Sequence, residues 1–380
     1  MEDIELSKEK SLVNLANSIL KHFGCKTYHD SIPEIDKLIK NSKKEKICLF
    51  LFDAFGKSIL EKYKNDAPFM YKHKFLEISS VFPPTTVACT TAVTTGKYPI
   101  ETGYLGWTQY FKSLDKFVDV FPSTEKDETS LDNSTKKIGV DIQETILKTR
   151  YIFDDLNDKY GKEVSKSVQS FSYKKEGMTI EQVNDAWAKE VDKSISKNLF
   201  TYAYNVYPDS LMHEYGVKNK HVKKVIIWIN KTIETLVKKH PDTLFLCISD
   251  HGMIDVKQFN IENIPGFVET LKRPLIAIEG RFASFFVRDK EKFLEIHKST
   301  PLLNEHFMLL TKDEVLKKHY FGYSENINPI ALETIGDYIL ISLDEYSLMD
   351  KFTCSHPFKG AHAGLSKQER EIYLQAYNTK

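Results

Sequence analysis

The sequence predicts an α/β protein in which a mostly parallel β-sheet is sandwiched between helices. The first observation is an apolar segment, Ile47–Phe52, followed by Asp53 and Gly56. Because both faces of this segment are apolar and polar residues follow only at its C-terminal end, it is typical of a buried parallel strand. The same design recurs at residues 243–252, TLFLCISDHG. Between the two, residues 217–239 have helical apolar spacing, which completes the strand–helix–strand order of a doubly wound sheet.

Further helices and strands fit this fold class. Ser11–Phe23 has apolar residues at helical spacing and is followed by Gly24, so it is predicted as an amphipathic helix. Residues 87–94 are predicted as a second helix that ends at Gly96, after two prolines that stop the preceding strand. Short strands are expected in PLIAIEG, RFASFFV and DYILISL, which lie between residues 274 and 343.

Two segments are less regular than the rest of the chain. Residues from about 112 to 172 are polar, and those from about 264 to 346 mix short strands with helices. We interpret both as excursions from a single domain of residues 1–380, because candidate site residues lie on both sides of each segment.

Composition excludes several classes of protein. The chain has 380 residues, of which 41% are hydrophobic, so it can bury a large core. Its 53 basic and 53 acidic residues leave no net charge to concentrate a polyanion, which disfavours general nucleic-acid binding. The N-terminal residues lack a continuous apolar stretch, and the longest apolar run is too short to cross a bilayer. We therefore expect neither a secretory signal nor a membrane partner.

The cysteines indicate a reducing compartment. Their number is five, they are dispersed, and no two have C-x-x-C spacing. This pattern favours a cytoplasmic location without a disulfide framework or a cysteine zinc site.

Aspartates and histidines supply candidate metal ligands. Asp209 and His213 are four residues apart, which places both on one face of a helix. Asp250 and His251 are adjacent at the end of a predicted strand, and His362 follows Gly360 in the segment KGAHAG near the C-terminus. Carboxylate oxygens and imidazole nitrogens suit zinc or manganese.

Each candidate also has a simpler structural interpretation. An aspartate that opens a helix is usually an N-cap, so Asp209 alone carries little weight. Asp-His-Gly after a strand is often a turn, and His362 alone would usually be a loop histidine. The order of all the elements along the chain favours a metal site.

A threonine-rich segment offers a candidate nucleophile. Thr85 or Thr86 begins the predicted helix at residues 87–94, where free backbone N–H groups favour a phosphate oxyanion. Ordinary capping by threonine is the alternative. A divalent cation can lower the pKa of such a hydroxyl, and a pair of cations can stabilise both the attacking and the leaving oxygen.

The ordered motifs resemble the type I phosphodiesterase/nucleotide pyrophosphatase family of the alkaline phosphatase superfamily. The resemblance covers most of the chain. Its motifs are NLANSILKHFG (14–24), LFLFDAFG (49–56), ISSVFPPTTVACTTAVTTGKYPIETGYLGW (78–107), PDSLMHEYG (208–216), SDHGM (249–253) and KGAHAGLS (359–366). It implies an alkaline-phosphatase-like core and hydrolysis of a phosphodiester or pyrophosphate bond in a small nucleotide-type substrate.

The resemblance also implies a site. Thr86 rather than Thr85 would be the nucleophile, because it lies at the family's distance before the Thr-Gly pair that closes the helix, and it would form a phosphothreonine or nucleotidyl-threonine intermediate. Two divalent ions, zinc or manganese, would be bound. The implied ligand sets are Asp53, Asp250 and His251 with the Thr86 hydroxyl, and Asp209, His213 and His362. His356 is not expected to be a ligand.

Alternatives remain within and outside this enzyme class. A phosphomonoesterase or phosphomutase of the same superfamily is the first, and a non-catalytic nucleotide-binding protein is the second. A sulfatase is disfavoured because Cys89 is not followed by Pro-x-Arg. Trp107 and Tyr110 could form a wall on which a base stacks, although core packing explains these two aromatic residues equally well.

Overall fold

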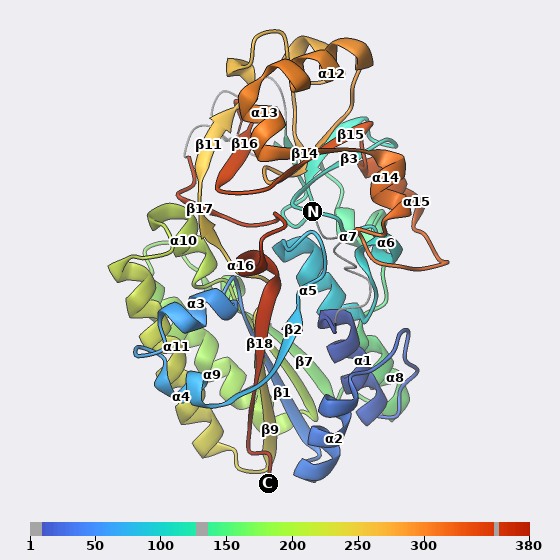
Figure 1. Cartoon of the computed structure of the whole chain (residues 1–380). Helices are drawn as coiled ribbons and strands as arrows, with labels where there is room; N and C mark the ends of the chain where they lie inside the picture. The colour runs from blue at the N-terminus through green and yellow to red at the C-terminus, as the bar shows by residue number, and fades with distance from the viewer. Residues whose placement is uncertain (1–9, 127–135, 353–356) are drawn as a thin grey trace.

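A computed structural model describes residues 10–126, 136–352 and 357–380 of the chain (Figure 1). A six-stranded sheet forms the centre of its larger part, the lower half of Figure 1. In spatial order its strands are β2 (Lys74–Ser79), β18 (Glu371–Tyr377), β9 (Thr243–Ile248), β1 (Lys46–Phe52), β8 (Phe200–Asn205) and β7 (Ser165–Gln169).

The sheet is mostly parallel. Strand β1 pairs in parallel with both β8 and β9, and β7 pairs in parallel with β8. Strand β18 runs antiparallel to its two neighbours, β9 and β2. The predicted α/β class with a mostly parallel sheet is therefore confirmed.

Both faces of the sheet are covered, which explains the continuous apolar run in β1. Ile47, Leu49 and Leu51 of this strand belong to one hydrophobic cluster, and Phe50 and Phe52 belong to another. Helices α1 (Leu12–His22), α2 (Pro33–Ser42), α5 (Thr86–Thr95) and α8 (Ile152–Tyr160) contribute to the first cluster. Helices α3 (Lys57–Lys62), α4 (Pro68–Lys72), α9 (Ile180–Lys197), α10 (Asp209–Tyr215) and α11 (Lys220–Lys239) contribute to the second.

A second, eight-stranded sheet lies in the upper part of Figure 1, and all its neighbouring strands are antiparallel. Its order is β14 (Phe307–Thr311), β15 (Tyr338–Ser342), β13 (Phe282–Phe285), β12 (Ala277–Glu279), β3 (Thr108–Phe111), β4 (Lys116–Asp119), β5 (Thr124–Lys126) and β6 (Lys136–Lys137). The strands predicted in PLIAIEG, RFASFFV and DYILISL correspond to β12, β13 and β15. The two expected excursions thus join in one sheet.

The first excursion is shorter than the sequence indicated. Helix α8 packs on the first face of the six-stranded sheet, and β7 pairs with β8 inside that sheet. Residues from about 152 to 169 therefore belong to the core rather than to the excursion. Ile152 and Leu156 of α8 and Val168 of β7 are buried, but the polar residues around them obscure this pattern in the sequence. That the whole chain forms one domain stays a prediction.

The remaining elements are short. Two two-stranded sheets pair β10 (Ile254–Asp255) with β17 (Gly360–Ala361), and β11 (Lys257–Asn260) with β16 (Tyr346–Met349). The other helices are α6 (Pro99–Thr102), α7 (Ile142–Thr145), α12 (Lys290–Ser299), α13 (Pro301–His306), α14 (Lys312–Lys317), α15 (Pro329–Thr334) and α16 (Lys367–Arg370), with 3-10 turns η2 (Ser170–Tyr173), η3 (Ile261–Asn263) and η4 (Val268–Thr270). Within the described ranges, no helix has the length and apolar character needed to cross a membrane.

Helix α5 lies between the two parts of the molecule. All ten of its residues are buried, although five are threonines. Ala88 and Ala92 face the cluster on the six-stranded sheet, whereas Val87 belongs to a cluster with Tyr104 and Phe111 from the other part. Small and β-branched side chains permit this close packing on every side, and the helix ends at Gly96 with φ of 69°.

A buried ion pair ties the eight-stranded sheet to the C-terminal segment. The Arg281 guanidinium donates to both Glu369 oxygens, from Nε at 2.7 Å and from an Nη at 3.0 Å. Glu369 also accepts from the Gly364 N–H at 2.8 Å, and its own carbonyl accepts from the Gly252 N–H at 2.8 Å. A Cβ on Gly252 would lie 2.0 Å from the Gln368 carbonyl oxygen, so only glycine permits this approach.

Replacing Glu369 by glutamine should destabilise the protein. The change leaves the Arg281 charge buried without its counter-charge, which costs about 3 kcal/mol of unfolding free energy or more. Urea unfolding followed by circular dichroism measures the effect. As a control, Glu345→Gln removes a carboxylate that pairs with Lys257 at an exposed position and should leave the unfolding midpoint nearly unchanged. Equal midpoints for the two variants would contradict the prediction.

Candidate metal and phosphate site

Three aspartates follow neighbouring strands of the six-stranded sheet. Asp53 comes directly after β1, Asp250 lies two residues after β9, and Asp209 begins α10 shortly after β8. Strand β1 lies between β8 and β9, and the three strands are parallel. Their carboxyl ends therefore meet at one edge of the sheet, which is where such folds bind ligands.

The first cluster contains Asp53, Asp250 and His251, all fully or almost fully buried. The Nε2 atom of His251 lies 3.4 Å from Asp53 Oδ1 and 3.6 Å from Asp250 Oδ2. Asp250 Oδ1 accepts hydrogen bonds from the backbone N–H groups of Ala54 at 3.0 Å and His251 at 2.9 Å. Its other oxygen, Oδ2, is buried without a hydrogen-bond partner.

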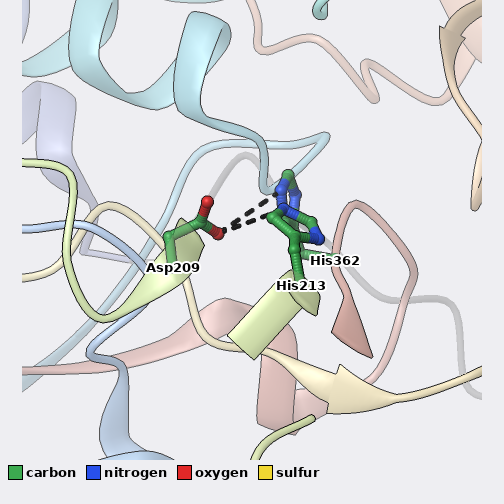
Figure 2. Close-up of side chains that lie close together, drawn as sticks. All are labelled: Asp209, His213 and His362. Atoms are coloured by element: carbon green, nitrogen blue, oxygen red, sulfur yellow. Dashed lines mark ion pairs between the residues drawn. The ribbon is translucent and has the colours of Figure 1, made fainter. Parts of the chain in front are cut away.

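The second cluster contains Asp209, His213 and His362 (Figure 2). Figure 2 shows both imidazoles directed at the same carboxylate oxygen: Asp209 Oδ1 lies 3.3 Å from His213 Nε2 and 3.9 Å from His362 Nε2. This oxygen is also buried without a hydrogen-bond partner. The spacing of four residues in α10 brings Asp209 and His213 together, whereas His362 arrives from the segment after β17.

Backbone carbonyls orient all three histidines. In each ring Nδ1–H donates to a carbonyl oxygen, which leaves the Nε2 lone pair free to face the carboxylates. The pairs are His213 with Gly360 at 2.7 Å, His251 with Gly252 at 2.9 Å, and His362 with Pro84 at 3.0 Å. This is the orientation in which proteins present histidine to a metal ion.

The two clusters are adjacent. The rings of His251 and His362 stack with their centroids 3.9 Å apart, and those of His213 and His362 lie 5.2 Å apart. Burial, and then the charges of Asp250 and Asp209, raise the pKa of Asp53 well above its usual value. Burial and the neighbouring His251 lower the pKa of His362 well below its usual value.

These properties fit two divalent cations. Buried carboxylates repel one another, and each cluster has one carboxylate oxygen without a hydrogen-bond donor. A cation in each cluster would pair with that oxygen and with the oriented Nε2 lone pairs, and mixed imidazole and carboxylate ligands are those that zinc prefers.

The backbone is strained beside two of these residues. Ala54 follows Asp53 with φ of 56°, and Ala363 follows His362 with φ of 85°. This left-handed region is uncommon for residues other than glycine and costs of order 1 kcal/mol or more. The Ala54 N–H bond to Asp250 helps to hold the first of these turns.

The structure distinguishes the two candidate threonines. The Thr86 hydroxyl lies 3.3 Å from His251 Nε2 and 3.4 Å from Asp53 Oδ2, so it belongs to the first cluster. Thr85 occupies the N-cap position of α5, and its hydroxyl donates to Glu279 at 2.5 Å instead.

Sequence reasoning missed two polar residues near these clusters. The Tyr204 hydroxyl donates to Asp53 Oδ2. Its position near the C-terminal end of β8, beside Asn205, is the signal that could have found it. Glu279 has no comparable local signal, because it reaches the site only through the pairing of β12 with β3.

The two aromatic candidates differ in their surroundings. Trp107 is 41% exposed, and its backbone N–H donates to Glu279 at 3.1 Å. The Tyr110 ring packs against Phe117 and Phe286, and its hydroxyl donates to Asp115. Tyr110 thus contacts residues of the eight-stranded sheet rather than either cluster.

The cysteines take no part in either cluster of the described residues. Cys89 is fully buried, with its thiol toward the carbonyls of Val81 and Pro83. Cys25, Cys48, Cys89 and Cys247 are free thiols, while Cys354 and His356 lie outside the described residues.

Comparisons with known proteins identify a family and similar folds. The profile of the family "Type I phosphodiesterase / nucleotide pyrophosphatase" matches residues 47–365. Human ectonucleotide pyrophosphatase/phosphodiesterase 5 has a similar structure, with a TM-score of 0.63 and 13% identity over 87% of each chain. The murine protein, in an inactive threonine-to-alanine form in complex with AMP, gives a TM-score of 0.62 and 13% identity over 87% of each chain. A search of curated protein sequences finds no match.

Metal content should depend separately on the two clusters. We expect Asp53→Asn and His362→Ala each to lose about one metal equivalent per chain, because each change removes a ligand from a different cluster. His240→Ala is the control, since His240 follows α11 and pairs with Asp192 of α9 at 2.8 Å rather than with either cluster, so it should leave the metal content unchanged. Elemental analysis of the purified variants measures the result, and full metal content in His362→Ala would remove that histidine from the site.

Proposed function

Because the chain belongs to the type I phosphodiesterase/nucleotide pyrophosphatase family, we propose that it cleaves a nucleotide-type phosphodiester or pyrophosphate through a covalent intermediate on Thr86. Family membership itself makes the chain a phosphoric ester hydrolase. The proposal that Thr86 is the nucleophile rests on one observation: its hydroxyl lies within 3.4 Å of both His251 Nε2 and Asp53 Oδ2. Thr85 holds the N-cap position, so Thr86 is not needed there.

The residues around Thr86 support its role as nucleophile. Its hydroxyl donates toward Asp53, which fixes the direction of the oxygen lone pairs, and Tyr204 in turn holds Asp53. The N-terminal N–H groups of α5 favour a phosphate oxygen next to this hydroxyl. In the first step the Thr86 hydroxyl gives up its proton and its oxygen forms a bond to phosphorus as the bond to the leaving oxygen breaks. The leaving oxygen departs with the bonding electrons and takes up a proton. In the second, water attacks the phosphothreonine or nucleotidyl-threonine and frees Thr86.

Two divalent ions complete the proposal. Asp53, Asp250 and His251 would hold one together with Thr86, and the Asp209 cluster would hold the other. Zinc is favoured by the imidazole ligands, and manganese is the alternative. Such ions, when bound, lower the pKa of a hydroxyl or water and offset the negative charge of a phosphoryl group.

A nucleotide is the substrate class we favour. The murine relative was captured in complex with AMP. Trp107, whose backbone N–H donates to Glu279, has an exposed side chain on which a base could stack. Tyr110 is not included in the proposed substrate site, because its ring is occupied by packing against other aromatic residues. A cytoplasmic location and the absence of general nucleic-acid binding stay predictions.

Thr86→Ala should abolish turnover while the protein stays folded. It deletes the attacking oxygen, so we expect activity on a nitrophenyl nucleotide diester to fall at least about a thousandfold. Thr94→Ala is the matched control, because Thr94 lies in the same helix and its hydroxyl bonds the carbonyl oxygens of Thr90 and Thr91. If Thr86→Ala kept wild-type turnover, the nucleophile would be another residue.

Substrate preference separates the proposal from its rivals. The metal-loaded protein should hydrolyse a nitrophenyl nucleotide diester with a higher kcat/KM than nitrophenyl phosphate. A strong preference for the monoester would instead favour a phosphomonoesterase or phosphomutase. A non-catalytic nucleotide-binding protein would bind AMP in calorimetry and turn over neither compound.

A further inference from the structure

Glu279 lies beside the proposed nucleophile, although it belongs to the other part of the molecule. It is the last residue of β12, and its Oε1 accepts hydrogen bonds from the Thr85 hydroxyl at 2.5 Å and from the Trp107 N–H at 3.1 Å. Thr85 immediately precedes Thr86. The carboxylate is therefore held next to the turn that presents the Thr86 hydroxyl.

The field of this carboxylate reaches both histidine clusters. Burial raises the pKa of Glu279 above its usual value, and the hydrogen bonds from Thr85 and Trp107, and then the charges of His213 and His251, oppose this rise. His213 belongs to one cluster and His251 to the other. A phosphoryl group bound between the clusters would feel the same field.

The nearby lysine does not cancel this charge. Lys126 Nζ lies 2.9 Å from the fully buried Asp350 carboxylate. Burial alone would lower the pKa of Lys126, but Asp350, then Asp119 and, more weakly, Glu279 raise it. Lys126 is in direct contact with Asp350 and is also influenced by Asp119, so its positive charge is not paired with Glu279 alone.

We propose that Glu279 selects the charge of the substrate: it disfavours the dianionic phosphoryl group of a phosphomonoester and so favours diesters, whose reacting phosphate carries one negative charge. The inference rests on the proposed function of Thr86. A phosphomonoester carries between one and two negative charges at neutral pH because its second pKa is about 6. The second negative charge of a dianionic phosphoryl group adds repulsion from the Glu279 carboxylate that a monoanionic diester lacks. This repulsion is strong where water is excluded.

The same repulsion acts on the product. Hydrolysis of a nucleotide diester leaves a nucleoside monophosphate, which is a monoester. A fixed carboxylate beside its phosphate weakens product binding and speeds release, while the monoanionic substrate is less affected. Product affinity is therefore a second measure of the selection that does not depend on turnover.

Glu279→Gln tests the proposal, because the amide oxygen of glutamine can still accept from Thr85 and Trp107 while the charge is removed. We expect the ratio of kcat/KM for nitrophenyl phosphate to that for the nitrophenyl nucleotide diester to rise about tenfold. Calorimetry should show AMP binding to the metal-loaded variant about tenfold more tightly than to the wild type. An unchanged ratio together with unchanged AMP affinity would overturn the proposal.

Two further variants separate charge from structure. Glu279→Asp keeps the charge and should keep the wild-type ratio of kcat/KM values. If its ratio instead matched that of Glu279→Gln, the effect would be structural and the proposal would be overturned. Glu345→Gln, the exposed control, should match the wild type. Equal losses on both substrates in Glu279→Gln would also overturn it. If the wild type prefers the monoester, the proposed diesterase function is wrong. Tenfold changes in the kcat/KM ratio and in AMP affinity in Glu279→Gln would even then support charge selection by Glu279.

Discussion

The structure depends on one electrostatic constraint: three carboxylates, from Asp53, Asp209 and Asp250, share a buried space at the ends of adjacent strands. Like charges at such short range are unfavourable in a low-dielectric interior unless opposite charges lie among them. The histidines, each turned by a backbone carbonyl, direct lone pairs into the same space. Much of the surrounding architecture keeps these groups in place, including the close contact of Gly252 with Gln368.

Features encoded by local sequence patterns could be predicted. The apolar run of β1 and the helical spacing of α11 predicted the parallel sheet and a covering helix. Burial on both faces of a strand leaves a direct signature in the sequence. The six aspartates and histidines of the two clusters were identified from short motifs and from the resemblance, and the structure brings them together in the two expected sets. The contacts that hold them in place leave no local pattern in the sequence.

Features that arise from distant pairings could not be predicted. Ile278 pairs with Thr108, and this pairing of β12 with β3 joins the second excursion to the strands that lead into the first. The same pairing of β12 with β3 places Glu279 in hydrogen-bond contact with Thr85. No periodicity near Glu279 reveals that neighbour, since a short amphipathic strand is compatible with many partners and registers. Trp107 and Tyr110 looked alike in the sequence but face different surroundings, for the same reason.

The position of β18 has a consequence for biosynthesis. This strand, residues 371–377, lies inside the sheet between the edge strand β2 and β9, although it is made last among the described strands. During translation the facing edges of β2 and β9 remain open until the ribosome has added these residues. Open edges pair readily with other chains, so the nascent protein is exposed to aggregation until the late strand inserts. Chaperone demand should therefore persist until these residues have been synthesised.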